Sequence, residues 1–243
     1  MRELARVSHV HHTHVQQGFA TFMAQVYRYM TGGLILSGLT AWVCAREPIL
    51  HHLYFVNNDG FLSPTLLSWV LVFAPFLLLL PLNRAGMQNN AGKAQIWFWI
   101  FSAVMGASLS NIFLFFDMSL IFRALLITGA TFGACSLWGH NTKQDLSAMG
   151  RFCLLAVIGI VIASLVNLFM KSSMVAFGID VVCILAFAGL TAYDTQKLSK
   201  LYTAMGTKSQ QIGGIAILGA LELYLDFINL FLAILRILSS RRR

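Results

Sequence analysis

The chain has 243 residues, of which 58% are hydrophobic and only 11% are charged. A soluble domain carries about 25% charged residues, so this composition excludes an ordinary water-soluble protein. The formal net charge is +8, but the basic residues are scattered between apolar segments without interleaved aromatic residues, which argues against nucleic-acid binding. The four cysteines have no CxxC spacing, so we expect neither a disulfide nor a zinc site.

The first 21 residues are predicted to form a polar cytoplasmic tail. They include a histidine cluster and lack the apolar stretch that a secretory signal needs. Clustered imidazoles can bind metal or sense pH near neutrality, but a mobile tail is the simpler interpretation. The cluster consists of His9, His11, His12 and His14. We therefore expect the first apolar segment to remain as a membrane span.

Seven apolar segments are long enough to cross a membrane, since a bilayer core of about 30 Å needs about 20 helical residues. They lie near residues 24–44, 64–82, 95–116, 119–139, 153–170, 174–193 and 214–237. This pattern predicts an all-α polytopic membrane protein, with one seven-helix domain over 22–238 and a basic tail over 239–243. Gly129 and Gly133 form a GxxxG pair in the fourth span, which predicts close helix packing there.

The distribution of Lys and Arg predicts that the N-terminus is cytoplasmic, because positive loops stay on that side. The basic residues of the N-terminal tail and the second, fourth and sixth loops are Arg2, Arg6, Arg84, Lys93, Lys143, Arg151, Lys197, Lys200 and Lys208. The opposite loops carry only Arg46 and Lys171. Seven spans then place the basic tail, Arg241–Arg243, outside, which conflicts with the same rule. Either that tail is translocated, or the last segment is re-entrant; the length of Gly214–Ile237 favours seven spans.

Two aspartates inside the apolar C-terminal third are the strongest functional signal. Asp194 closes the run Met174–Tyr193, and Asp226 lies within Gly214–Ile237. A charged residue at mid-helix costs roughly 2.5–3.5 kcal/mol on insertion, so an intramembrane carboxylate indicates a function. The two can meet across a helix pair, and like charges disfavour joint ionisation. The pair is therefore expected to share a proton and to sense pH.

Other polar residues extend this constellation. Glu222 and Asn229 share a helix face with Asp226 and are expected to line an ion pathway. Asp180 lies fourteen residues before Asp194, towards the outer end of the same span, where it can mark the mouth of that pathway. Arg84, which follows the second span, is the candidate basic partner of the aspartate pair.

The residue types favour a weak site for Ca²⁺ or H⁺ at Asp194 and Asp226, because Ca²⁺ prefers oxygen ligands and the spans hold no His or Cys cluster. No cofactor is expected. An intramembrane aspartyl protease also carries aspartates on its sixth and seventh helices, and Ala192-Tyr193-Asp194 matches half of that signature. The other half needs glycines, where this chain has Leu223-Tyr224-Leu225 before Asp226. We therefore predict that the chain is not an enzyme.

Two strings, Gly189-Leu-Thr-Ala-Tyr-Asp-Thr-Gln-Lys197 and Leu223-Tyr-Leu-Asp-Phe-Ile-Asn-Leu-Phe231, resemble signatures of the Bax inhibitor-1, or transmembrane Bax-inhibitor-motif, family. The resemblance covers nearly the whole chain. It implies seven helices with the last one central, and a pH-sensitive Ca²⁺ leak controlled by two aspartates that are hydrogen-bonded in the closed state. These correspond to Asp194 and Asp226, with Arg84 as a loosely aligned arginine partner.

The resemblance leaves a second role open. Some bacterial members modulate a membrane-bound AAA protease, so an interaction role without transport is the alternative function. The size and short tails favour a bacterial inner-membrane protein. Glu222 departs from the family pattern, because a small or neutral polar residue is expected at that position.

Overall fold

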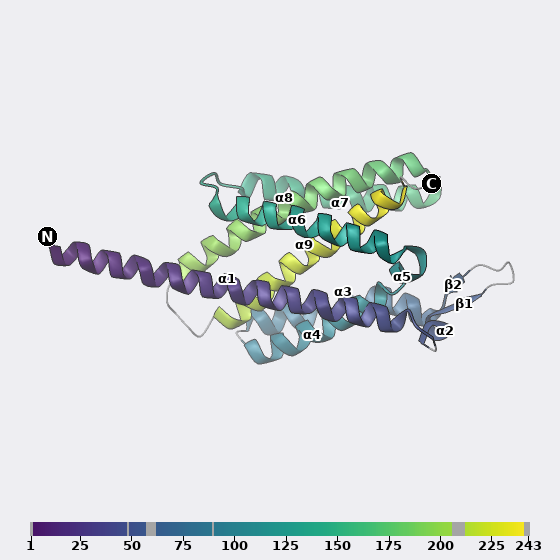
Figure 1. Ribbon diagram of the computed structural model, residues 1–243, viewed down its shortest axis with the longest axis horizontal. Helices are drawn as coiled ribbons and strands as arrows, with labels where there is room; N and C mark the ends of the chain where they lie inside the picture. The colour runs from purple at the N-terminus through teal and green to yellow at the C-terminus, as the bar shows by residue number, and fades with distance from the viewer. Residues whose placement is uncertain (1, 48, 57–61, 89, 206–211, 241–243) are drawn as a thin grey trace. The chain divides into compact units, whose positions relative to one another are not determined.

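The fold is known from a computed structural model that describes residues 2–47, 49–56, 62–88, 90–205 and 212–240 (Figure 1). The chain divides into two compact units. The first unit comprises Met1–Phe115 and Tyr202–Leu221, and the second comprises Phe116–Leu201 and Glu222–Arg243. Helices dominate both units, and the two last helices each contribute residues to both of them.

Six helices within the described residues are long and apolar enough to cross a membrane. They are α3 (Leu66–Met87), α4 (Ala91–Ser108) continued by the short α5 (Ile112–Phe115), α6 (Met118–Asn141), α7 (Ser147–Met170), α8 (Ser173–Met205) and α9 (Ile212–Ser240). They coincide with the second to seventh predicted spans.

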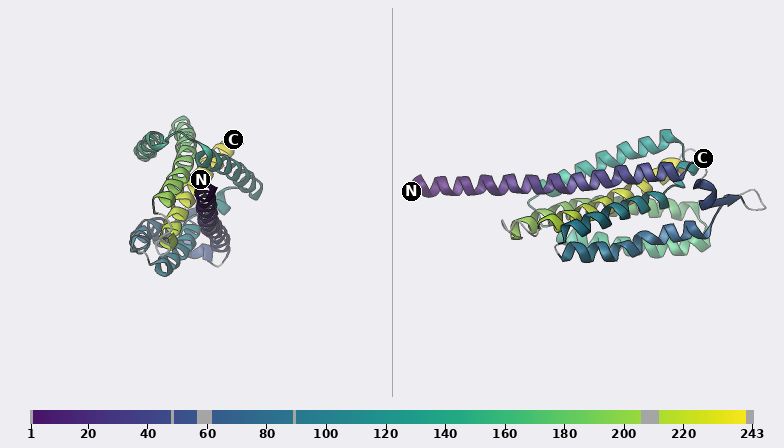
Figure 2. Two further views of the ribbon diagram at one scale, coloured as in Figure 1. Left: turned by 90° about the vertical axis from the view of Figure 1, so that its left-hand side faces the viewer. Right: turned by 90° about the horizontal axis from the view of Figure 1, so that it is seen from below.

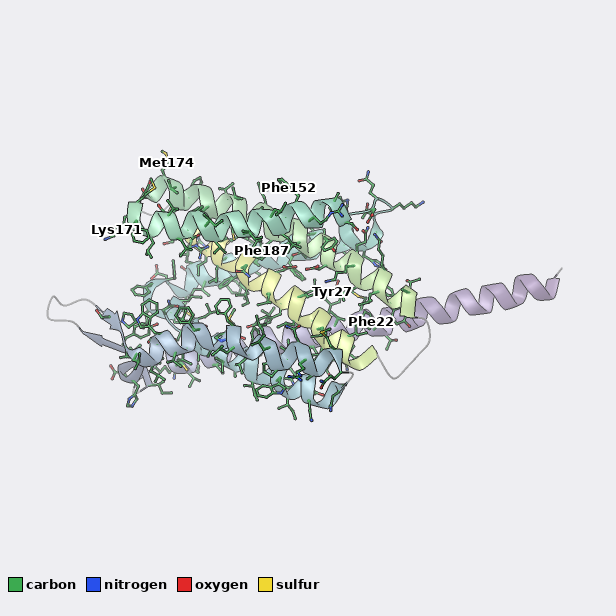
Figure 3. All side chains as sticks on the ribbon, turned by 180° about the vertical axis from the view of Figure 1, so that it is seen from behind. Phe22, Tyr27, Phe152, Lys171, Met174 and Phe187 are labelled. Atoms are coloured by element: carbon green, nitrogen blue, oxygen red, sulfur yellow. The ribbon has the colours of Figure 1, made fainter. Side chains whose placement is uncertain are left out.

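The burial of these helices differs in a way that fits a lipid environment. Only 6% of the apolar window of α7 is buried, against 67% of that of α9. Large apolar side chains such as Phe152 and Phe169 are exposed on α7, and Figure 3 shows Phe152 on its ribbon. Contiguous exposed apolar surface of this kind marks a membrane-facing region. The predicted class, an all-α membrane protein, is confirmed.

The first helix, α1 (Arg2–Cys44), differs from its prediction. The predicted polar tail and the predicted first span, 24–44, form one continuous helix of 43 residues (Figure 2). At 1.5 Å per residue it is about 65 Å long, roughly twice a bilayer core. It is not among the six described helices that are long and apolar enough to cross a membrane. The histidine cluster lies on α1 among residues 2–17, whose side chains are outside the described ones.

The first unit is packed through small residues. A Cβ at Gly106 of α4 would collide with the Ser37 backbone of α1, so the two helices approach closely there. The Ser37 hydroxyl donates to the Ser102 carbonyl at 2.7 Å across the same contact. Gly86 of α3 meets the start of α9 in a similar way, at Gly214.

An unpredicted β-hairpin follows α2 (Ile49–Leu53). Its strands, β1 (Tyr54–Val56) and β2 (Leu62–Pro64), pair antiparallel, with Tyr54 opposite Pro64. Thr65 then caps α3: its side chain accepts from the Ser68 amide at 3.4 Å. The strands have three residues each, too few for a periodic pattern to reveal them in the sequence.

In the second unit, glycines bring α6 and α7 against α8. A Cβ at Gly139 of α6 would collide with the Ala192 backbone, and one at Gly150 of α7 would meet the Tyr193 ring. Gly129 and Gly133, by contrast, have no described atom within 4 Å of their Cβ positions, so the packing prediction from the GxxxG pair was wrong. A motif of small residues marks a place where helices can approach, and this one faces open space.

A short turn joins α7 to α8. Lys171 adopts a left-handed conformation with φ of 51°, and its amide donates to the Asn167 carbonyl at 2.7 Å. Figure 3 shows Lys171 and Met174 at this end of the unit. The turn needs only Lys171 and Ser172, because the left-handed residue ends one helix and α8 begins at Ser173.

The sixth predicted span was too short. It was expected to end at Tyr193, but α8 continues to Met205. The stretch 194–205 contains no Gly or Pro, and Leu198 and Tyr202 are buried four residues apart, which is a helical period. Asp194 therefore lies inside a 33-residue helix and not at its end.

Candidate functional site

The predicted aspartates meet in the second unit. Asp194 lies on α8 and Asp226 on α9, and their carboxyl groups are hydrogen-bonded to each other. The Asp226 side chain is buried, with only 4% of the residue exposed. Its Oδ2 atom has no hydrogen-bond partner among the described residues. An ionised carboxylate only accepts hydrogen bonds, so the contact requires a proton on one of the two groups.

An ion pair lies directly beside the aspartates. Lys197, one turn after Asp194 on α8, donates from Nζ to Glu222 Oε1 of α9 at 2.7 Å. The same Nζ atom lies 4.0 Å from Asp194 Oδ1. We use the name acidic cluster for Asp194, Asp226 and Glu222 together with Lys197. Two of the three acidic side chains, Glu222 and Asp194, thus lie within 4.0 Å of one ammonium group.

A second charged contact joins the same two helices further along. Arg236 of α9 donates from Nε to Asp180 Oδ1 of α8 at 2.7 Å. The Asp180 side chain is 10% exposed and that of Arg236 is 49% exposed. Since residue numbers fall along α8 from Asp194 to Asp180 while they rise along α9 from Asp226 to Arg236, the helices run antiparallel.

Packing from α6 and α7 surrounds the aspartates with apolar and small side chains. Phe132 of α6 packs edge-on against Phe227 of α9, with ring centroids 5.6 Å apart. The hydroxyl oxygens of Ser136 and Thr195 lie 3.1 Å apart and join α6 to α8. Cys153 of α7 approaches α8 at Gly189. These contacts hold the backbone of α8 on both sides of Asp194.

A buried glutamine ties the loop between α6 and α7 to the same part of α8. Gln196 donates from Nε2 to the Gln144 carbonyl at 2.7 Å and accepts from the Leu146 amide at 3.0 Å. Next to it, the exposed Lys200 and Asp145 form an ion pair at 2.5 Å. This loop therefore fixes α8 beside the acidic cluster, at Gln196.

The remaining predicted site residues are placed differently. Asn229 uses its side-chain amide within its own helix, donating to the Leu225 carbonyl at 2.8 Å. Arg84 lies in the last turn of α3, in the first unit, and its pairing with the aspartates stays a prediction. Within the described residues, no three His, Cys, Asp or Glu side chains are arranged to hold a metal ion. A weak Ca²⁺ contact at Asp194 and Asp226 stays a prediction.

Two basic partners were missed in the sequence. Arg236 is the one basic residue within the run Gly214–Ile237, and a lone charge in an apolar run indicates a partner of opposite sign. Asp180 was the matching acid in the preceding run. Lys197 was read as a topology signal because the sixth span was expected to end before it. The continuation of α8 brings this lysine against Glu222.

Comparisons with known proteins agree with this picture. A family model described as inhibitor of apoptosis-promoting Bax1 matches residues 19–243. The inner membrane protein YbhL of Escherichia coli is 40% identical over 226 residues, which cover 93% of this chain and 94% of the relative. An uncharacterized membrane protein of Streptococcus pyogenes is 35% identical over 94% of this chain and 96% of its own. The chain therefore belongs to the Bax inhibitor family of membrane proteins.

Proposed function

We propose that this protein is a Ca²⁺ leak pathway in a bacterial inner membrane, with Asp194 and Asp226 as its proton-sensitive gate. The observation that supports it best is the hydrogen bond between the two carboxyl groups, next to a buried Asp226 oxygen without a described partner. Both residues lie within apolar helices, where a carboxyl group is costly to insert.

The proton in this contact is the basis of the gate. While one aspartate is protonated, the hydrogen bond holds α8 to α9 and the pathway is closed. When the proton is lost, neither carboxylate can donate, and two like charges face each other. At about 4 Å and an effective dielectric constant of 20, their repulsion is about 4 kcal/mol. The contact then loosens and exposes oxygen ligands to Ca²⁺, so the leak increases as pH rises.

Other residues have supporting roles in this proposal. Asp180 and Asn229 lie on the same two helices as the aspartates and extend the ion pathway along them. Arg84 is the basic partner that the family resemblance implies for the aspartate pair. The positive loops support an N-terminus in the cytoplasm. The E. coli relative, which is named an inner membrane protein, supports the location.

The test is Ca²⁺ uptake into liposomes loaded with a calcium dye, followed from about pH 6 to 8. We expect wild-type flux to rise with pH and Asp194→Asn to lose this dependence, because an asparagine amide donates to Asp226 at every pH. Asp145→Asn, which removes an exposed acid in the loop between α6 and α7, is the control and keeps the wild-type response.

Two results would contradict this proposal, the first its gate and the second the leak itself. The first is a normal pH response in Asp194→Asn, which excludes the aspartate pair as the gate. The second is the absence of wild-type flux above empty liposomes when the protein is folded. That result would favour the alternative role, an interaction with a membrane-bound AAA protease.

Two aspartates that share a proton also occur in aspartic proteases. The lack of enzymatic activity stays a prediction, which rests on the missing glycines before Asp226.

A further inference from the structure

Lys197 is a charged residue that the gate itself does not use, although its ammonium lies beside it. The 2.7 Å contact with Glu222 has the length of a charge-assisted hydrogen bond. The 4.0 Å separation from Asp194 is too long for a hydrogen bond. The ammonium is therefore bound to Glu222 and only adjacent to the aspartates.

The lysine can reach the aspartates with a small movement. A shift of roughly 1 Å would bring Nζ within hydrogen-bond distance of Asp194. Lysine carries its charge on a flexible four-carbon stem, and both Lys197 and Glu222 are only partly buried, so this movement needs no repacking. An ammonium on Asp194 would occupy the carboxylate oxygens that a divalent cation needs.

We propose that Lys197 is a tethered competitor for the cation site and that Glu222 holds it away from Asp194 and Asp226, which keeps the pair open to Ca²⁺. This inference rests on the proposed function and names a residue pair that regulates the same site. It makes Glu222 a positioning residue that acts through Lys197, and it gives a role to the one acid that departs from the family pattern.

The alternative role for Glu222 is that of a direct Ca²⁺ ligand, and the geometry does not favour it. The Glu222 carboxylate is directed to Lys197. Together with the aspartates it forms no three-residue set suited to a metal, as judged over the described residues. A carboxylate that already accepts from an ammonium would have to exchange that partner before it could bind a metal.

The test is whether Lys197→Gln restores the Ca²⁺ flux that Glu222→Gln loses. Flux is measured into liposomes at a fixed pH of about 8. In Glu222→Gln the ammonium loses its partner and moves to Asp194, so flux falls roughly tenfold, the change expected for one added charge-assisted contact. In Lys197→Gln the competitor is absent, and flux is equal to or above that of the wild type. The double variant has no lysine to block the site, so it recovers the flux that Glu222→Gln loses.

The matched control is Lys200→Gln. Lys200 lies three residues further along α8 and pairs with exposed Asp145. It therefore carries the same charge outside the acidic cluster, and its removal is expected to leave flux unchanged. If Lys200→Gln raises flux as much as Lys197→Gln does, surface charge explains the effect and the proposal is wrong. If the double variant stays as low as Glu222→Gln, then Glu222 is a direct ligand, which also overturns the proposal.

A second readout separates this inference from the leak itself. Ca²⁺ that binds only the folded protein raises its Tm in detergent, and this shift needs no transport. A wild type without flux, but with a Ca²⁺-dependent shift that Glu222→Gln loses and the double variant regains, would refute the leak and support the role of Lys197. Flux in the wild type without rescue in the double variant would support the leak and refute the role of Lys197. A folded wild type with neither flux nor shift would overturn both.

Discussion

The two charged contacts between α8 and α9 are built from the same residue types but balance their charges differently. At one contact, Asp180 and Arg236 form a one-to-one ion pair at 2.7 Å. At the other, three clustered acids lie beside Lys197, which contacts Glu222 and lies 4.0 Å from Asp194. A buried Asp226 oxygen has no partner among the described residues. Fourteen residues of α8, about 21 Å, separate Asp180 from Asp194. The first contact pairs each charge with one of opposite sign, whereas the acidic cluster holds more acids than basic groups.

The largest loss of stability is expected when one partner of the Asp180–Arg236 ion pair is removed. Asp180→Asn or Arg236→Gln leaves one charge without its partner in a region where Asp180 is nearly buried. Removing one member of a buried pair costs 3–5 kcal/mol, and we expect about 2 kcal/mol here because the Arg236 side chain is 49% exposed. The measurement is thermal unfolding of each variant in detergent.

The double variant Asp180→Asn with Arg236→Gln is the control for this prediction. It leaves no unpaired charge, so it should recover part of the stability that either single variant loses. Losses that simply add would show that the two side chains do not depend on each other. The contact would then not be the fixed point of the helix pair.

The acidic cluster should respond to a similar substitution with the opposite sign. In Asp226→Asn, the amide can donate to Asp194 without a shared proton, whereas the wild-type hydrogen bond is lost once the pair is fully ionised. We therefore expect the variant to be more stable than the wild type at pH 8, by about 1 kcal/mol. The difference should vanish at pH 5. Thermal unfolding over this pH range measures it.

A loss of stability in Asp226→Asn at pH 8, comparable to that of Asp180→Asn, would remove the contrast between the two contacts. It would mean that the aspartate pair is a structural contact like the other. Asn229→Ala is a useful reference on the same helix, because its side chain donates to the Leu225 carbonyl of its own helix. It should show no change in stability between pH 5 and pH 8.

The sequence predicted the spans well because about 20 apolar residues are required wherever a helix crosses a membrane. It also predicted that Asp194 and Asp226 would meet, since a carboxylate in an apolar span needs a polar neighbour. The partners of Glu222 and Asp180 were not predicted, because the register of α8 against α9 decides which side chains face each other. Register depends on tertiary packing, and a single sequence does not reveal it.

The smallest effect is expected at Asp145, an exposed residue that lies outside the membrane spans, in the loop between α6 and α7, and pairs with exposed Lys200. Hydrogen bonds from Lys200 and then Ser147 lower the pKa of Asp145 to about 2. A carboxyl group with a lowered pKa adds stability above its unfolded value of about 4 and loses it as pH falls towards 2. Solvent and salt screen this pair, so Asp145→Asn should lower Tm by about 1 °C or less at pH 7 and by less still at pH 3. A decrease in Tm as large as that of Asp180→Asn, or one that persists in 1 M salt, would contradict this prediction. An exposed ion pair would then fix α8 as firmly as the Asp180–Arg236 pair does, and burial would not explain the difference between the two ion pairs.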